Sequence, residues 1–286
     1  MPKISVLMPV YNPNETHLRE AIESILSQTF RDFEFLIVND ASTLPHVDTV
    51  VQSYQDPRIQ YAVNDTNIGI THTRNKLIDW ASGEYLAVMD HDDISLPTRL
   101  AEQVAYLDQH KDVGVVSCVF ERCRWSCKKG KVKQRPVEDQ DIKAALMRSC
   151  ALLHPAAMIR KQVLIDNHIR YEHAFTPAED YALWCRLIPY TQFHNIPKVL
   201  FRYRCHSGNT SRNNRAKMHR STLAIQAFVE YENPDLYKAF QKVATNKTIC
   251  RLFGCIPLWK TVTQAERTWV YLFTFIPLLS YKKTAS

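Results

Sequence analysis

Glycine is scarce in this sequence, with six residues among 286, and none precedes Gly69. A glycine-rich phosphate-binding loop therefore does not follow the first expected strand. Biased tracts are also absent, which argues against a repeat protein and against a disordered scaffold. Hydrophobic residues (45%) and charged residues (23%) occur in globular proportions, so we expect one large domain, or one domain with an appendage.

The eight cysteines include no Cys-x-x-Cys pair. Cys118, Cys123 and Cys127 could be considered as zinc ligands, but a fourth ligand at the usual spacing is missing. The apolar run Ile4–Val10 is too short for the core of a secretory signal. We therefore expect reduced thiols in a cytoplasmic protein.

Short apolar runs alternate with helical segments in the first ninety residues. The runs are Ile4–Val10, Phe33–Val38, Ile59–Val63 and Tyr85–Met89, each of a length that suits a buried strand. Strands that alternate with helices predict an α/β fold, with a mainly parallel sheet and right-handed crossovers.

A polar cluster follows each of the four runs. The clusters are Tyr11-Asn12, Asn39-Asp40, the segment Asn67 to Arg74, and Asp90-His91-Asp92-Asp93. Ligands bind to open α/β sheets at the carboxyl ends of the strands. We therefore expect the four clusters to converge on one crevice.

The acidic turn Asp90-x-Asp92-Asp93 is the sharpest local feature. Carboxylates this close together repel one another unless a cation compensates them, and such oxygen ligands suit Mg²⁺ or Mn²⁺. A solvated acidic turn that caps the helix after Pro97 is the alternative. The position directly after an apolar strand favours the metal.

Three further positions have both a functional and an ordinary explanation. Asp40 could accept an N–H group of a pyrimidine ring, or it could simply form a turn. Arg74 could meet a diphosphate near the start of a helix, or be an ordinary helix-face arginine. Asp180, after Glu179, could be a general base, or one of two acids in the first turn of a helix. His206 follows a strand-like run and could line the crevice; His154 is the other histidine of interest.

Taken in order, these motifs resemble those of family 2 glycosyltransferases, inverting enzymes with the Rossmann-like GT-A fold. The similarity runs from about Pro2 to Ser211. It comprises Val-Tyr-Asn, Asp-x-Ser, Asn-x-Gly with Arg-Asn, Ser-Gly-Glu-Tyr before Asp-x-Asp-Asp, His-Pro, Glu-Asp, and a late Tyr-x-x-His. The resemblance implies a mixed, mainly parallel sheet flanked by helices, within a domain over residues 1–212.

By matching motif, the residues that would bind the nucleotide sugar are Tyr11, Asp40, Asn67, Arg74 and Asp90. Asp40 would bind the uracil ring with Tyr11 flanking it, and Asp90 would contact the nucleoside. Asp92 would bind Mn²⁺ or Mg²⁺ on the diphosphate, with His206 approaching the metal or the diphosphate. Asp180 would be the catalytic base.

The implied reaction transfers a hexose or N-acetylhexosamine from a UDP-sugar to a saccharide or a lipid-linked glycan, with a β-linked product. Such a reaction suits polysaccharide or lipooligosaccharide biosynthesis. Two alternatives remain open: a non-catalytic subunit that binds nucleotide sugars, and a sugar nucleotidyltransferase. The second lacks its glycine-rich loop here, and no nucleic-acid partner is expected.

Residues 213–286 are expected to form a helical, basic extension. Residues 201–286 carry 14 basic and 4 acidic side chains, a net charge of +10, whereas residues 1–200 carry 22 and 25, a net charge of −3. The apolar segment Trp269–Ser280 is too short to span a bilayer, which needs about twenty residues. It could pack on the core or lie at an anionic membrane surface. The second option predicts a peripheral protein on the inner face of the cell membrane.

Overall fold

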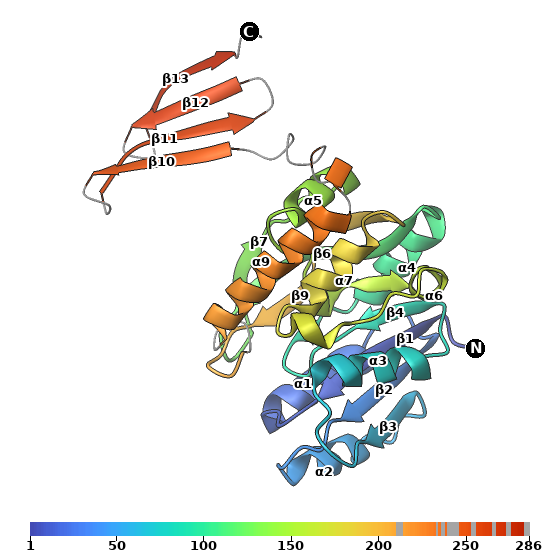
Figure 1. The fold of residues 1–286 in the computed structure, drawn as a ribbon. Helices are drawn as coiled ribbons and strands as arrows, with labels where there is room; N and C mark the ends of the chain where they lie inside the picture. Colours follow the sequence, from blue (N-terminus) through green and yellow to red (C-terminus); the bar gives the residue numbers. More distant parts are fainter. Residues whose placement is uncertain are drawn as a thin grey trace. The chain divides into compact units, whose positions relative to one another are not determined.

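The computed structural model describes residues 1–209, 214–232, 234, 235 and 238, together with the backbone of four later strands. The chain forms two compact units, Met1–Phe228 and Val229–Ser286 (Figure 1). The expected boundary at residues 212 and 213 falls outside the described residues.

The first unit alternates strands and helices along its N-terminal half, as the apolar runs predict. The elements are β1 (Ile4–Val10), α1 (Glu15–Leu26), β2 (Phe33–Asn39), α2 (His46–Gln52), β3 (Ile59–Val63), α3 (Ile70–Trp80), β4 (Tyr85–Val88), β5 (Ile94–Ser95) and α4 (Arg99–Gln109). Every residue of β1, β2 and β4 is buried, which explains why these strands are continuous apolar runs.

The second half of this unit completes the sheet. It contains β6 (Val113–Cys123), β7 (Gly130–Lys133), α5 (Asp139–Leu146), β8 (Met158–Arg160), α6 (Lys161–Asp166), α7 (Glu179–Leu187), β9 (Gln192–Arg204) and α9 (Arg215–Glu232). The strand order is β3-β2-β1-β4-β8-β6-β9-β5, with β7 paired to β6. Strands β1 to β4 pair in parallel with their neighbours in that group, whereas β8 is antiparallel to both β4 and β6. The predicted mixed, mainly parallel sheet with flanking helices is confirmed.

The order of the first four strands positions the site. The chain moves outward from β1 to β3 through α1 and α2, and then returns through α3 to β4 on the other side of β1. Because crossovers are right-handed, this reversal puts α3 on the face opposite α1 and α2. Helices α1, α2 and α4 share one core with alternate residues of β1, among them Ile4, Val6 and Met8. The reversal point between β1 and β4 is where ligands bind in such sheets.

The C-terminal region differs from the helical extension that we expected. Helix α9 is present, but β10 (Asn246–Leu252), β11 (Ile256–Gln264), β12 (Arg267–Leu272) and β13 (Ile276–Lys282) follow it and form an antiparallel sheet. Residues 259–262 and 268–271 are rich in β-branched and aromatic side chains, which favour extended backbone. None of the helices in the described part of the chain has the length and hydrophobicity needed to cross a bilayer.

Candidate active site

One cleft of about 940 Å³ opens at the carboxyl ends of β1 and β4. All eight predicted site residues line it, and they are Tyr11, Asp40, Asn67, Arg74, Asp90, Asp92, Asp180 and His206. Further lining residues come from α1, β6, β7, β9 and α9, and from the segments around His154 and Thr176. The predicted convergence of the four polar clusters is therefore what the structure shows.

Asp40 anchors the loop that joins β3 to α3. Its buried carboxylate accepts hydrogen bonds from the backbone N–H groups of Ile68 and Gly69, each at 2.9 Å, and from Asn64 Nδ2 at 2.8 Å. Asn67 Nδ2 donates to the Asp40 backbone oxygen at 3.2 Å. A carboxylate has about four acceptor positions, and these bonds use three of them. One position is left for a donor in the cleft.

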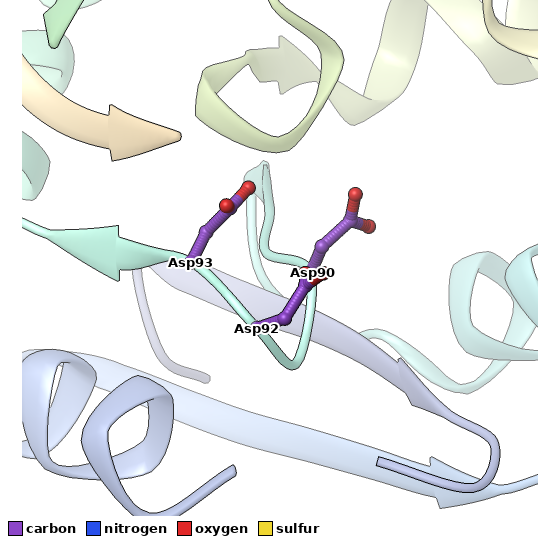
Figure 2. Close-up of side chains that lie close together, drawn as sticks. All are labelled: Asp90, Asp92 and Asp93. Atoms are coloured by element: carbon purple, nitrogen blue, oxygen red, sulfur yellow. The ribbon is translucent and has the colours of Figure 1, made fainter. Parts of the chain in front are cut away.

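The acidic turn brings three carboxylates together (Figure 2). Asp90, Asp92 and Asp93 each offer an oxygen, and these oxygens all lie within 4.8 Å of one another. Asp92 Oδ2 also lies 2.7 Å from His206 Nε2, so the structure joins the two predicted metal ligands across 114 residues of sequence. Burial and the charge of Asp92 raise the pKa of Asp90, while Arg74 opposes the shift.

Arg74 connects the acidic turn to the start of α7. Its Nη1 lies 2.7 Å from Glu179 Oε1, and its Nη2 lies 3.4 Å from Asp90 Oδ1. The guanidinium carbon is 5.6 Å from the centre of the Tyr171 ring. Within the described part of the chain, Arg74 Nε has no hydrogen-bond partner. Arg74 thus lies in the cleft as expected, where two carboxylates bind it.

Asp180 and Glu179 differ in their surroundings although they are neighbours in the first turn of α7. Glu179 is 5% exposed and pairs with Arg74. Asp180 is more exposed and accepts a hydrogen bond from the backbone N–H of Tyr181 at 2.7 Å. Burial and the charge of Glu179 raise the pKa of Asp180 to about 6, against the opposing charge of Arg74. A carboxyl with this pKa can exchange a proton near neutral pH.

Comparison with known proteins identifies the scaffold that carries these groups. Residues 5–167 match the model of glycosyl transferase family 2. An uncharacterized glycosyltransferase of Methanocaldococcus jannaschii is 32% identical over 210 residues, which cover 71% of each chain. The chain belongs to glycosyltransferase family 2. It is therefore an enzyme of the glycosyltransferase class, and the sugar nucleotidyltransferase alternative is not supported.

Two further proteins are similar to this family 2 glycosyltransferase. The O-antigen biosynthesis glycosyltransferase WbnJ of Escherichia coli is 26% identical over 261 residues, which cover 90% of this chain and 97% of WbnJ. The crystal structure of residues 1–349 of S. aureus TarS in complex with UDP-GlcNAc has a TM-score of 0.68 at 22% identity. That likeness covers 84% of this chain and 69% of the TarS chain, and it shows the GT-A fold.

Asp93 belongs to the predicted acidic turn of this glycosyltransferase, whereas Arg204, which binds it, was not among the predicted site residues. Asp93 is fully buried and its Oδ1 accepts the backbone N–H of Arg204 at 2.8 Å. Its Oδ2 has no partner among the described residues. Burial, together with the charges of Asp92 and Asp90, raises the pKa of Asp93 well above its usual range. A buried, unpartnered carboxylate oxygen beside two others fits a divalent cation, which would relieve this repulsion.

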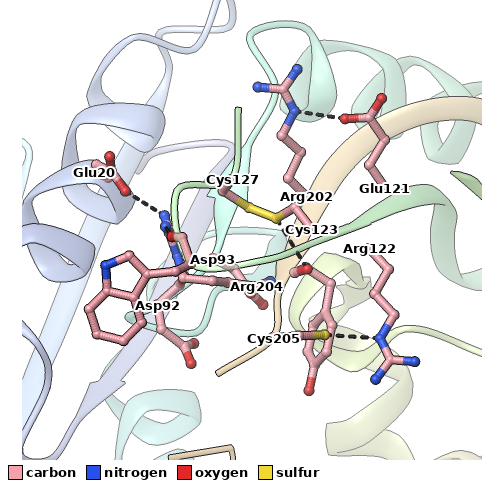
Figure 3. The surroundings of a disulfide bond; sticks show 12 residues. Glu20, Asp92, Asp93, Glu121, Arg122, Cys123, Cys127, Arg202, Arg204 and Cys205 are labelled. Atoms are coloured by element: carbon pink, nitrogen blue, oxygen red, sulfur yellow. Dashed lines mark hydrogen bonds and ion pairs between the residues drawn. A yellow bond between two sulfur atoms is a disulfide. The ribbon is translucent and has the colours of Figure 1, made fainter. Parts of the chain in front are cut away.

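Arg204 stabilises the acidic turn through hydrogen bonds. Its Nε donates to the backbone oxygen of Asp92 at 2.6 Å, and its other nitrogens bind Glu20 and the backbone oxygen of Trp125 (Figure 3). No local sequence feature singled out Arg204. Its partners lie 79 to 184 residues away, so no short-range pattern points to them.

Two histidines near the cleft are held neutral by burial. His17 lines the cleft in α1, and its ring lies 4.4 Å from that of Trp125 and 5.5 Å from that of His206. Burial, with the charges of Arg204 and His206, lowers the pKa of His17 to about 4. Burial also lowers the pKa of His154 well below its usual range, and its Nε2 lies 2.7 Å from the Tyr171 hydroxyl.

The cysteines correct one prediction. Cys123 and Cys127 form a disulfide with a Cα–Cα separation of 4.9 Å, within the normal range for such a bond (Figure 3). The expectation of reduced thiols was therefore wrong for these two residues, whereas a zinc site had not been expected because a fourth ligand is missing. The spacing of four residues across the turn after β6 brings the two side chains together. The disulfide closes the turn that carries Trp125, whose ring contacts His17 and His206.

Proposed function

We propose that this glycosyltransferase moves a hexose or N-acetylhexosamine from a UDP-sugar to a hydroxyl group of a saccharide or lipid-linked glycan, with inversion to a β-linkage. The single observation that carries the proposal is the arrangement of the cleft. Asp180, with a pKa of about 6, lines the same cleft as Asp90 and Asp92 of the acidic turn, and Arg74 lies between them.

The donor half of the proposal rests on Asp40 and the acidic turn. The remaining acceptor position of Asp40 suits the N3–H group of uracil, and Tyr11, which is 46% exposed at the cleft, can flank the ring. Asn67 helps to hold the Asp40 loop. Mn²⁺ or Mg²⁺ bound by Asp92 with Asp90 and Asp93 would neutralise the charge that develops on the departing diphosphate. His206 holds the Asp92 carboxylate in place at 2.7 Å.

The transfer half rests on Asp180. Its carboxylate takes the proton of the acceptor hydroxyl while that oxygen forms a bond to the anomeric carbon. The bond between that carbon and the phosphate oxygen breaks on the opposite face, and UDP leaves with the electron pair. Attack from the face opposite the leaving group inverts the configuration. Glu179 is bound to Arg74, so Asp180 is the better placed of the two acids.

A donor screen tests the proposal. The purified protein is incubated with UDP-glucose, UDP-galactose, the UDP-N-acetylhexosamines and, as a nucleotide control, GDP-mannose, each with and without Mn²⁺. We expect metal-dependent nucleotide release from at least one UDP-sugar, raised by a saccharide acceptor and absent in Asp92→Ala. If no UDP-sugar gives release but UDP still binds, the protein is a non-catalytic nucleotide-sugar binder. If GDP-mannose alone reacts, the assignment of uracil to Asp40 is wrong.

The cellular role is a separate proposal. WbnJ, which is similar over almost its whole length, is named for O-antigen biosynthesis, and this favours polysaccharide or lipooligosaccharide assembly. Lipid-linked acceptors would make contact with the inner face of the cell membrane useful, and basic residues near an anionic surface each contribute about 1 kcal/mol. We expect the chain to cosediment with anionic liposomes and to lose this binding when residues 255–286 are deleted. Equal sedimentation of both forms would contradict the membrane role of this segment.

A further inference from the structure

The β6–β7 hairpin carries a dense positive charge. Between residues 122 and 137 there are no acidic residues, and the basic ones are Arg122, Arg124, Lys128, Lys129, Lys131, Lys133 and Arg135. The hairpin lies on the far side of β4 from β2, the strand that Asp40 follows, because the sheet order is β2-β1-β4-β8-β6. The hairpin therefore lies away from the Asp40 loop, while its turn reaches the acidic turn, where Trp125 contacts His206.

Three of the seven cations line the cleft. They are Arg122, Lys133 and Arg135, whereas Arg124, Lys128, Lys129 and Lys131 do not line it. Arg122 Nε donates to Cys205 Sγ at 2.9 Å. Across the described ranges, no acidic side chain forms an ion pair with Arg122, Lys133 or Arg135. Cations that face a cleft without acidic partners favour an anionic ligand.

Arg135 is the most constrained of the three. Its guanidinium carbon lies 5.4 Å from the centre of the Phe120 ring in β6, a distance that suits a cation–π contact. Its Nε is buried and, among the residues that the structure describes, has no hydrogen-bond partner. A planar guanidinium held in this way can bind a phosphate or carboxylate through two parallel hydrogen bonds.

Arg135 and the proposed base Asp180 line the same cleft, together with Cys150. Asp90 and Asp92 serve the donor, so the cations that share this cleft with Asp180 remain for the other substrate. An anionic group at Arg135 would therefore hold an acceptor with its hydroxyl near Asp180.

We propose that Arg122, Lys133 and Arg135 form a cationic subsite that binds a phosphate or carboxylate group of the acceptor saccharide. The acceptor class is thus an anionic glycan, and the three cations orient it toward Asp180. This inference rests on the proposed function, because it takes Asp40 and the acidic turn to be occupied by the UDP-sugar.

Calorimetric titration into the UDP- and Mn²⁺-saturated protein tests the subsite. The probes are glucose 6-phosphate, glucuronate and, as the uncharged control, glucose. We expect at least one of the anionic sugars to bind roughly tenfold more tightly than glucose, since charge-assisted hydrogen bonds are stronger than neutral ones. A preference for glucose 6-phosphate indicates a phosphate-bearing acceptor, and a preference for glucuronate indicates an acidic sugar. Equal binding of all three, or binding of none, overturns the proposal.

Two triple variants with the same change in net charge provide the matched comparison. Arg122→Gln/Lys133→Gln/Arg135→Gln removes the cations that line the cleft, and Lys128→Gln/Lys129→Gln/Lys131→Gln removes cations of the same hairpin outside it. We expect the first variant to bind anionic sugars no better than glucose and the second to keep the preference. Equal loss in both variants would mean that only the general charge of the hairpin attracts anions, and the subsite would be wrong.

Different results would contradict the proposed function and the cationic subsite. UDP binding with Mn²⁺ is measured first, in every variant, and it also reports whether the variant is folded. Absence of UDP binding in the unaltered protein contradicts the proposed function itself. Normal UDP binding without any preference for the anionic sugars contradicts only the cationic subsite. Should the first triple variant not fold, the single variant Lys133→Gln must still lower the affinity for the preferred anion.

Discussion

Arg74 Nη1 lies 2.7 Å from Glu179 Oε1, and this ion pair joins the beginning of α3 to the beginning of α7. The two side chains are 11% and 6% exposed, so neither charge is compensated by water. The pair holds Glu179 away from substrates and leaves its neighbour Asp180 to face the cleft. It also places the proposed base at a fixed position relative to Asp90, which Arg74 contacts through its other nitrogen at 3.4 Å.

Removal of Arg74 should cost stability as well as activity. Arg74→Met leaves the buried Glu179 carboxylate unpaired, and breaking a buried pair in this way costs about 3–5 kcal/mol. Arg19→Met is the control, since its pair with Glu15 is 38% and 50% exposed and should contribute about 0–1 kcal/mol. Urea unfolding measures both. A similar, small loss for the two variants would show that the Arg74 pair is not structurally important.

Asp92 should control metal-dependent binding of the nucleotide. In Asp92→Ala, the site loses one of its three carboxylates and the partner of His206. We expect the Mn²⁺-dependent part of UDP affinity to fall at least tenfold, or about 1.4 kcal/mol, while the exposed control Asp32→Asn is unchanged. Calorimetry with and without Mn²⁺ makes the comparison. Unaltered Mn²⁺ dependence in Asp92→Ala would place the metal elsewhere.

Asp40 should determine the choice of pyrimidine. The N3 atom of uracil carries a hydrogen and that of cytosine does not, so a carboxylate acceptor favours UDP over CDP. Asp40→Asn introduces an NH₂ group opposite the backbone N–H groups of Ile68 and Gly69 or opposite the base. We expect UDP affinity to fall and its preference over CDP to disappear. If the variant keeps the preference at full strength, another group reads the base.

The pH dependence of transfer should follow Asp180. A raised pKa of about 6 means that the carboxyl is neutral, and unable to accept a proton, below that pH. We therefore expect kcat/KM at saturating Mn²⁺ to fall about tenfold per pH unit below this value and to level off above it. UDP affinity, measured at the same pH values, separates this effect from donor binding. A flat kcat/KM profile through pH 6 would contradict the assignment.

Local patterns predicted which residues line the cleft, and they predicted little of what supports those residues. Asp40 and Asp92 follow apolar strands directly, so the carboxyl ends of a parallel sheet bring them together. The partnership of Arg74 with Glu179 spans 105 residues, and that of Arg204 with Glu20 spans 184. Neither ion pair can be predicted from a pattern of neighbouring residues. Single acids at a helix start look alike in sequence, and burial beside Glu179 is what gives Asp180 its raised pKa.

Local patterns also failed to predict the position of β7 and the C-terminal strands. Arg122, Lys133 and Arg135 lie at the cleft because β7 pairs with β6, and the basic composition of this segment does not predict that pairing. Strands β10 to β13 lie where we expected helices, because β-branched and aromatic residues there outweigh any helical periodicity. Strand pairing depends on partners distant in sequence, so the residues of one segment alone do not predict it.

The role of Asp180 as the base is tested most directly by the variant Asp180→Asn, which keeps the size of the side chain and removes its basicity. Transfer to a saccharide acceptor and Mn²⁺-dependent UDP binding are measured on the same preparation, with Glu179→Gln alongside. We predict that UDP affinity stays within about twofold while turnover falls by two or more orders of magnitude, as loss of a general base requires. Turnover in Asp180→Asn close to that of the unaltered enzyme would contradict the proposed mechanism.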